Sequence, residues 1–293
     1  MTLISVIVPF LNEEPYIEKC IRSLLDQDFD KDKYELIFID NGSTDRSAEI
    51  VRGFPNIIIL EESIKCPYAA RNKGLSVAKG QIFAFTDADC VVSYNWLTQI
   101  YEGITKLSAA ILLGKRFFSI GSSAALKMFE DYENAKVEYV LNMCHKKYFY
   151  GFTNNMAVRQ DVLKETGLFS VSVSAPAMSD TELIQKWISR HPDTKIIYLP
   201  RMEITHLEIK DMKTWLGKMH IYGKYNMLVK AATSYAPIDN KTKLQVYTYC
   251  FKKNDYKLTQ KIILFLLLIL GYLYYESGAI EGHLKSISSG NVN

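Results

Sequence analysis

The chain lacks the cysteine patterns of disulfide-rich and zinc-binding proteins. It has five cysteines among 293 residues, and none of them forms a Cys-x-x-Cys pair. An odd number of scattered cysteines argues against both a disulfide framework and a structural zinc site. We therefore expect a reducing location on the cytosolic side. Residues 1–5 also lack a basic flank and a small-residue cleavage site, so we expect no secretory signal.

Internal repeats and low-complexity tracts are missing as well. The composition, with 48% hydrophobic and 23% charged residues, is that of an ordinary globular protein. A chain of this length can form one large domain or two modest ones and can bury a full core.

Long apolar runs are absent, with one exception at residues 262–275. A helix of 14 residues is about 21 Å long at ~1.5 Å per residue, which is short of the ~30 Å hydrocarbon layer of a bilayer. A re-entrant or interfacial helix fits this length better than a spanning one, with Tyr272, Tyr274 and Tyr275 at headgroup depth. A buried core helix is the alternative.

Basic residues are concentrated before this apolar run. Residues 207–261 contain eleven lysines and four acids, a net charge of +7, whereas the whole chain carries +3. A polybasic stretch favours an anionic membrane or a nucleic acid, and the neighbouring apolar run favours lipid. We expect residues 207–293 to form a basic, helical, membrane-proximal segment that binds no nucleic acid. The expected location is the cytoplasmic face of a membrane, as a peripheral or monotopic protein.

The first ~110 residues alternate short apolar strands with helices, a pattern that predicts an α/β fold. Crossover connections between such strands give a mainly parallel central sheet with helices on both faces. Ligands bind beyond the carboxyl ends of the strands in sheets of this kind. Three polar clusters fall at such ends, after the strands that finish near Pro9, Asp40 and Asp87.

Asp87 and Asp89 follow the apolar strand at residues 81–86. Residues two apart in an extended segment point the same way, so both carboxylates are expected to face one hard cation. A solvated loop is the alternative for an isolated Asp-x-Asp. The convergence of three polar clusters at one sheet edge favours the metal site.

Six short motifs resemble those of the family 2 glycosyltransferases, in the order of that family, between about residues 5 and 206. They are Ser5–Pro9 with Asn12 and Glu13, Ile39–Asp45, Ala70–Gly74, Asp87–Asp89, Asn154–Val158 and Ser179–Leu183. Asn41 departs from the family pattern, which often has a second aspartate there, and Ser179 stands where glutamate is common. The resemblance implies a Rossmann-like nucleotide-diphospho-sugar transferase fold of the GT-A type. Residues 1–206 would be the catalytic domain, with a nucleotide-binding half up to about residue 110 and an acceptor half at 111–206.

The implied reaction is a metal-dependent, inverting transfer of a hexose from a nucleotide-diphosphate donor, expected to be a UDP-sugar. The acceptor would be a glycan or a lipid-linked intermediate, as in polysaccharide biosynthesis. The cofactor would be Mn²⁺ or Mg²⁺, which stabilises the charge on the leaving diphosphate. By resemblance Asp89 is the first metal ligand, Asp87 acts directly or through water, and His206 completes the metal sphere or contacts the diphosphate. A structural role is the alternative for His206, as for any lone histidine.

Donor contacts are expected from several strand ends. Asp40 is placed to accept the imide N–H of uracil, or to cap its own turn. Arg71 can pair with phosphate through its fork of donors. Ala88 lies between the two aspartates of the donor motif, and Asn154 and Asn155 would bind the donor sugar or the acceptor, or else form a turn. The resemblance also implies that the base and ribose are lined by Pro9, Leu11 and Glu13.

An inverting displacement needs one carboxylate that takes the proton of the acceptor. By resemblance this general base is Asp180, and Glu182 is the competing candidate. Acidic residues are also common in the first turn of a helix, which is the structural alternative for both.

Two other functions stay open. A nucleotide-sugar-binding subunit without turnover would use its basic tail to join a membrane complex. A nucleotidyltransferase of the same general fold would need a Gly-rich basic loop after the first strand, and residues 9–14 are neither Gly-rich nor basic.

Overall fold

The computed structural model describes residues 2–118, 123–144, 148, 151–171, 179–232 and 238–288, and among these it leaves out the side chains of 226–232 and 285–288. The chain divides into two compact units. One consists of Met1–Phe117 and Phe149–Leu207, and the other of Phe118–Tyr148 and Glu208–Asn293. The boundary at residue 206 between a catalytic domain and a C-terminal segment stays a prediction.

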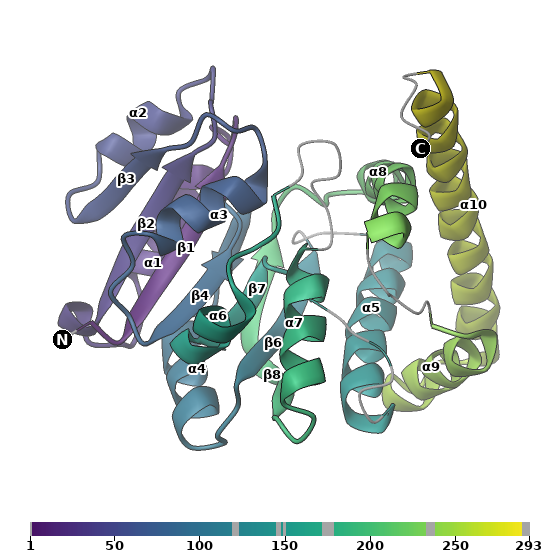
Figure 1. Ribbon diagram of the computed structural model, residues 1–293. Coiled ribbons are helices and arrows are strands. Elements are labelled where there is room, and N and C mark those ends of the chain that lie inside the picture. The colour runs from purple at the N-terminus through teal and green to yellow at the C-terminus, as the bar shows by residue number, and fades with distance from the viewer. Residues whose placement is uncertain are drawn as a thin grey trace. The chain divides into compact units, whose positions relative to one another are not determined.

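The first unit is built on a mixed eight-stranded sheet with the order β3-β2-β1-β4-β7-β6-β8-β5 (Figure 1). β1 is parallel to both β2 and β4, and β2 is parallel to β3. β7 is antiparallel to β4 and β6, and β5 is antiparallel to β8. The strands are β1 (Ile4–Phe10), β2 (Tyr34–Asp40), β3 (Ile57–Glu61), β4 (Ile82–Thr86), β5 (Cys90–Val92), β6 (Ile111–Phe118), β7 (Asn155–Arg159) and β8 (Ile196–His206).

Helices cover both faces of this sheet, as the sequence predicts. Alternate residues of β1, such as Val6 and Val8, share one hydrophobic cluster with residues of α1, α2 and α4. α3 packs on the other face, where a Cβ atom at Gly74 would lie 2.8 Å from the side chains of both Ile7 and Ile39. The helices of the unit are α1 (Ile17–Leu25), α2 (Ser47–Arg52), α3 (Pro67–Leu75), α4 (Trp96–Thr105), α6 (Gln160–Thr166) and α7 (Ser179–Arg190), with a short 3-10 turn at Lys31–Lys33.

The strand register brings the predicted polar clusters to one edge of the sheet. Phe10 is paired with Asp40, and Asp40 with Glu61, so β1, β2 and β3 end together. All seven residues of β1 are buried, which explains why its sequence is apolar apart from Ser5 rather than alternating. The residues that follow these strands therefore lie at the edge where the sequence predicts a ligand.

Over the described residues of the second unit, the regular secondary structure is helical apart from the last residue of β6. Its helices are α5 (Ala124–Met143), α8 (Met212–Ala232), α9 (Asn240–Lys253) and α10 (Leu258–Ser288). α10 has 31 residues and is about 46 Å long at ~1.5 Å per residue. The predicted helix of about 21 Å is thus too short, because the helix extends beyond the apolar run at both ends.

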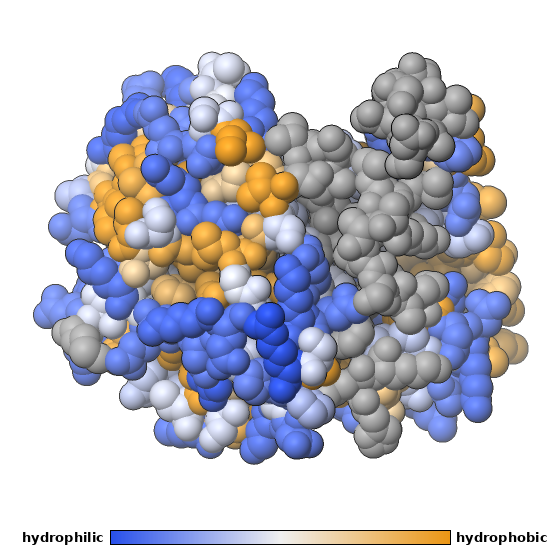
Figure 2. Space-filling view, in the orientation of Figure 1, coloured by the Kyte–Doolittle hydropathy of each residue, from blue (hydrophilic) through white to orange (hydrophobic). Residues whose placement is uncertain are grey.

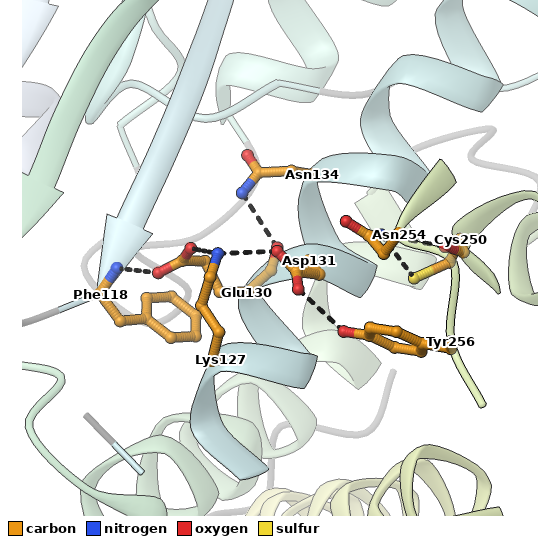
Figure 3. Close-up of polar contacts among 8 residues, drawn as sticks. All are labelled: Phe118, Lys127, Glu130, Asp131, Asn134, Cys250, Asn254 and Tyr256. Atoms are coloured by element: carbon orange, nitrogen blue, oxygen red, sulfur yellow. Dashed lines mark hydrogen bonds and ion pairs between the residues drawn. The ribbon is translucent and has the colours of Figure 1, made fainter. Parts of the chain in front are cut away.

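A polar network joins α5 to the residues between α9 and α10 (Figure 3). Glu130 is buried, accepts a hydrogen bond from the N–H of Phe118 at 2.7 Å and pairs with Lys127. The hydroxyl of Tyr256 donates to Asp131 at 2.8 Å. Burial, followed by the hydrogen bond to the Asp131 carboxylate, raises the pKa of Tyr256, which keeps this phenol protonated as a donor. The network fixes the chain just before α10 begins.

Glycines allow α8 and α10 to pack closely. A Cβ atom at Gly223 would lie 1.8 Å from the carbonyl oxygen of Tyr275, and one at Gly278 would lie 1.9 Å from that of His220. His220 also bonds Ser277 at 2.9 Å and Glu281 at 2.8 Å. Contacts of small residues and polar groups are the means by which helices associate in an apolar medium.

Candidate active site

The segment after β4 is a tight turn rather than an extended strand. The N–H of Cys90 donates to the carbonyl oxygen of Asp87 at 3.1 Å, which closes a turn over residues 87–90. The premise that Asp87 and Asp89 point the same way because they are two apart in a strand is therefore wrong. The two carboxylates have different partners, Arg71 for Asp87 and both Cys90 and His206 for Asp89.

Asp89 lies at the centre of a buried cluster with Cys90 and His206. Its Oδ2 atom lies 3.1 Å from Nδ1 of His206, and its Oδ1 atom accepts a hydrogen bond from the Cys90 thiol at 3.4 Å. One ligand atom from each of the three residues lies within 4.8 Å of the others. The pairing of β5 with β8 sets Cys90 directly opposite His206, and the N–H of Leu207 donates to the Asp89 carbonyl at 2.8 Å. Residues far apart in the sequence thus meet because of one antiparallel strand pair.

Asp87 pairs with Arg71 instead. The guanidinium Nη2 donates to Oδ1 of Asp87 at 2.5 Å, and the Arg71 side chain is 4% exposed while that of Asp87 is 34% exposed. The Nε atom of Arg71 is buried without a hydrogen-bond partner among the described residues. A buried guanidinium with an unused donor is suited to an anionic ligand.

Asp40 fills the turn-capping role and keeps one oxygen outside it. Its Oδ1 atom accepts hydrogen bonds from the N–H groups of Gly42 at 3.2 Å and Ser43 at 2.8 Å. Both bonds use the same oxygen, so Oδ2 is not part of the cap. Asn41, which departs from the family pattern, donates through Nδ2 to the carbonyls of Glu62 at 2.9 Å and Ile64 at 2.7 Å. An aspartate could not donate these bonds, because a carboxylate has no hydrogen to give.

The residues expected around the base and ribose have different environments. Pro9 is buried in β1, Leu11 is 41% exposed, and Glu13 is half-buried. The N–H of Glu13 donates to the hydroxyl of Ser47 at 2.8 Å, and Asn12 accepts from the N–H of Thr44 at 2.8 Å. These bonds join the loop after β1 to the loop after β2 and to the start of α2. Ala88 is 2% exposed and packs in the hydrophobic core, so its side chain points into the protein.

Asp180 is buried at the start of α7. Its Oδ2 atom accepts from the N–H of Thr153 at 3.1 Å and its Oδ1 atom from the N–H of Thr181 at 2.8 Å. Burial raises the pKa of this carboxyl, and the hydrogen bond from Thr181 and the charge of Arg71 oppose the rise. Tyr68 also bonds this carboxyl and its own pKa is raised, first by burial and then by the Asp180 charge. A buried carboxyl with a raised pKa is a candidate for a functional site, so the role of Asp180 as general base stays a prediction.

The other candidate residues, Glu182, Asn154 and Asn155, differ in how many of their polar atoms already have a partner within the protein. Glu182 is 25% exposed and pairs with Lys186 at 2.6 Å on the surface of α7. Asn155 is fully buried, accepts from the indole of Trp96 at 2.9 Å and donates to two carbonyls, so its role is structural. The Oδ1 atom of Asn154 is buried and has no hydrogen-bond partner among the described residues. Of these two asparagines, Asn154 is the one with an oxygen to offer a ligand.

The cluster of Asp89, Cys90 and His206 fits a divalent metal ion. It supplies an oxygen, a sulfur and a nitrogen atom from buried side chains, and such donors are those that transition-metal ions bind. Asp87 is outside this cluster, so its contribution to a metal site stays a prediction.

The sequence reasoning missed Cys90 and Tyr68. Both lie near predicted site residues in the sequence, since Cys90 follows Asp89 and Tyr68 lies one helical turn before Arg71. Their adjacency was the available signal for both.

Comparisons with known proteins identify the family of this chain. The sequence model of the glycosyl transferase family 2 matches residues 5–167. The glycosyltransferase AglE of Haloferax volcanii is 31% identical over 175 residues, which cover 58% of this chain and 56% of that protein. The poly(ribitol-phosphate) beta-glucosyltransferase of Bacillus spizizenii is 26% identical over 239 residues, 78% of this chain and 36% of that protein. The chain thus spans about a third to a half of the length of these curated relatives.

Solved structures share the fold. The mannosyltransferase PcManGT of Pyrobaculum calidifontis, in complex with GDP-Man and Mn²⁺, has a TM-score of 0.62 at 18% identity, covering 95% of this chain and 86% of that one. TarS 1-349 of S. aureus, in complex with UDP-GlcNAc, has a TM-score of 0.57 at 19% identity, covering 99% and 92%. The predicted GT-A type fold is therefore confirmed. Because the family model covers more than half of the sequence, the chain belongs to the glycosyl transferase family 2.

Proposed function

We propose that this protein is a metal-dependent, inverting glycosyltransferase that moves a sugar from a UDP-sugar to a glycan or lipid-linked acceptor. The observation that carries the proposal is the arrangement of the first unit. A buried Asp89–Cys90–His206 cluster, a buried arginine with an unused donor and a buried carboxyl all belong to it. Family membership supplies the reaction class.

The donor would bind along the carboxyl ends of the parallel strands. Asp40 would accept the imide N–H of uracil through Oδ2 while Oδ1 caps the turn. Arg71 would direct its unused Nε–H toward the diphosphate. The TarS structure contains UDP-GlcNAc, which supports the choice of uridine, whereas the PcManGT structure contains a guanosine donor. Asp40 is therefore the residue on which base choice depends.

Asp89 and His206 would hold a divalent ion, Mn²⁺ or Mg²⁺. When bound, such an ion neutralises charge on the two phosphates of the leaving nucleotide. The Mn²⁺ in the PcManGT structure supports a metal in this fold. The ion pair with Arg71 holds Asp87 beside the phosphate-facing guanidinium, so Asp87 would orient that arginine as well as contribute to the metal site.

Asp180 would take the proton of the acceptor hydroxyl. The N–H groups of Thr153 and Thr181 fix its two oxygens, and burial keeps water away from the carboxyl. A single displacement inverts the anomeric carbon and needs no enzyme nucleophile. The name of the Bacillus spizizenii relative specifies a beta-linked product, which is what one inversion gives from an alpha-linked donor. Asn154 would hydrogen-bond the sugar or the acceptor through its Oδ1 atom.

The test is nucleotide release. The released nucleoside diphosphate, UDP or GDP, is measured chromatographically after incubation with a panel of UDP-sugars and Mn²⁺, with EDTA and with GDP-mannose as controls. We expect release from at least one UDP-sugar, loss of release in EDTA, and less release from the guanosine donor. Absence of nucleotide release from every donor would favour a non-catalytic nucleotide-sugar-binding subunit.

We also propose that the second unit associates with the cytoplasmic face of a membrane. Among the described residues, Leu258–Leu284 of α10 is the helix that is long and apolar enough to cross a bilayer, and 17% of its most apolar stretch is buried. A helix that is apolar all round but covered on one side needs an apolar medium for the other. Figure 2 shows these hydrophobic side chains along the outer edge of α10. Many residues of this stretch expose more than 40% of their surface, among them Ile262, Ile263, Phe265, Leu266, Ile269, Tyr272, Leu273 and Tyr274.

Exposed Lys252 and Lys257 lie just before this helix, where anionic headgroups would be contacted. The test is co-sedimentation with vesicles of phosphatidylcholine alone or with phosphatidylglycerol. The wild type should bind the anionic vesicles, and Leu266→Glu with Leu273→Glu should lose binding. Leu107→Glu, at a residue of the first unit that is 45% exposed, is the control. Equal binding of all three proteins would contradict the proposal.

A further inference from the structure

Cys90 has a position that core packing alone does not require. It is fully buried, and its thiol donates to the carboxylate that would hold the metal, at 3.4 Å. Directly opposed residues of an antiparallel pair place their side chains on the same face of the sheet, with Cβ atoms about 4.5–5.5 Å apart. Cys90 and His206 form such a pair. The sulfur is therefore on the same side as the imidazole.

The spacing of the three side chains suits one small ion. Zn²⁺ in a tetrahedral site lies about 2.3 Å from sulfur and about 2.0 Å from nitrogen or oxygen, so its ligand atoms are about 3.3–3.6 Å apart. Oδ2 of Asp89 lies 3.1 Å from Nδ1 of His206, and its other oxygen, Oδ1, lies 3.4 Å from Sγ of Cys90. One ligand atom from each of the three residues lies within 4.8 Å of the other two. A closure of at most about 1.5 Å for any pair therefore brings all three into that range.

We propose that Sγ of Cys90 is a ligand of the divalent ion held by Asp89 and His206, and that it makes the site select zinc and cobalt over magnesium. The inference rests on the metal dependence proposed above and adds a ligand and a metal class to it. Coordination replaces the S–H bond by a metal–sulfur bond, and the proton leaves to the solvent. Sulfur and imidazole donors suit zinc-like ions, whereas magnesium prefers oxygen and near-ideal octahedral geometry. Three protein ligands also leave a position open for a phosphate oxygen.

Cys20 provides a matched control. It is fully buried in the same hydrophobic cluster, and its thiol donates to the carbonyl of Asp87 at 3.6 Å. It thus touches the same turn as Cys90, but the cluster of possible metal ligands does not include it. A Cys20 variant therefore shows the effect of losing a buried thiol from this region, and a Cys90 variant shows the added effect of losing a metal ligand.

The experiment is titration of the full chain with Co²⁺, with and without UDP, followed by absorbance. The wild type should show visible d–d bands and a near-ultraviolet thiolate-to-cobalt charge-transfer band. Cys90→Ser should keep the d–d bands and lose the charge-transfer band, and Cys20→Ser should keep both. Competition by Zn²⁺ and Mg²⁺ should show a Zn²⁺ preference that falls at least tenfold in Cys90→Ser. Circular dichroism verifies that each variant is folded, and Cys90→Ala replaces Cys90→Ser if the latter is not.

Two results would overturn the inference in different ways. Cobalt binding by the wild type without a charge-transfer band, or with one that survives in Cys90→Ser, would leave the metal site in place and remove Cys90 from it. Absence of cobalt binding by the wild type, with or without UDP, would remove the proposed metal site itself and the inference with it.

Discussion

The N–H of Thr153 donates to Oδ2 of Asp180 at 3.1 Å, so the loop before β7 and the first turn of α7 are held together. Gly151 permits this approach. A Cβ atom at that residue would lie 2.8 Å from the backbone carbon of Asp180 and 2.9 Å from the N–H nitrogen of Thr181. The loop therefore sets the position of the proposed base.

Gly151→Ala should displace Asp180. The added methyl group meets backbone atoms, which cannot rotate away, and overpacking of this kind costs about 1–3 kcal/mol. We expect a fall in kcat of at least tenfold and a lower Tm, measured by transfer assay and calorimetry. Gly217→Ala is the control, because nothing lies within 4 Å of its Cβ position. Alanine stabilises the interior of a helix by about 1 kcal/mol relative to glycine. The Tm of the Gly217→Ala control should therefore not fall. Equal behaviour of the two variants would refute the role of Gly151.

Asp180→Asn should abolish transfer and leave UDP binding nearly intact. The amide oxygen still accepts one hydrogen bond, but it cannot take a proton at neutral pH. Glu182→Gln should keep most of the activity, because Glu182 pairs with Lys186 on the helix surface. Steady-state kinetics and isothermal titration of UDP measure the two properties separately. If Glu182→Gln is the inactive variant and Asp180→Asn the active one, the assignment of the base is reversed.

The acid limb of the pH–rate profile should lie above the ordinary aspartate pKa of 3.8, because burial raises the pKa of Asp180. The base works as the carboxylate, so kcat falls as the pH drops through the raised value. The raised pKa of Asp180 also makes the stability of the protein depend on pH. The folded state holds the Asp180 proton more tightly than the unfolded state does, so its contribution to the free energy of unfolding decreases as pH rises above 3.8. A profile with no acid limb above 3.8 would contradict the assignment.

Arg71→Met should weaken UDP binding at least tenfold, because it removes a buried guanidinium that faces the proposed diphosphate. It should also move the acid limb to higher pH, since the charge of Arg71 lowers the pKa of Asp180. Arg71→Lys keeps the charge without the fork of donors, so it should restore the pH profile more than the affinity. Arg52→Met, at a residue 55% exposed on α2, is the control. Titration calorimetry with UDP and pH–rate profiles are the measurements. An unchanged affinity in Arg71→Met would exclude a phosphate contact.

The parts of the fold that depend on local pattern were predictable. β1, β2 and β4 are apolar runs that end in polar clusters, and parallel strands bring such ends to one edge. Asp40 and Asp89 lie close to these ends for that reason. The length of α10 was not predictable from hydropathy, because Ser277, Gly278 and Glu281 interrupt the apolar run. These residues continue the helix because they contact α8.

The parts that depend on distant pairing were not predictable. Cys90 meets His206 through the antiparallel pairing of β5 and β8, and nothing in the local sequence specifies that register. The turn at 87–90 likewise required the backbone bond between Cys90 and Asp87. Asn155 matches a family motif, yet its partners are Trp96 and the carbonyls of Lys115 and Met202, so only the structure separates it from Asn154.

The most direct test of the metal-dependent donor site is the Kd of UDP by isothermal titration calorimetry, with Mn²⁺ and with EDTA, for wild type and Asp89→Asn. Asp89 is 4% exposed and lies 3.1 Å from His206, so its loss should remove the metal without disturbing Asp40 or Arg71. We predict that EDTA weakens UDP binding to the wild type at least tenfold and has little further effect on Asp89→Asn. An equal Kd for the wild type in Mn²⁺ and in EDTA would contradict the account.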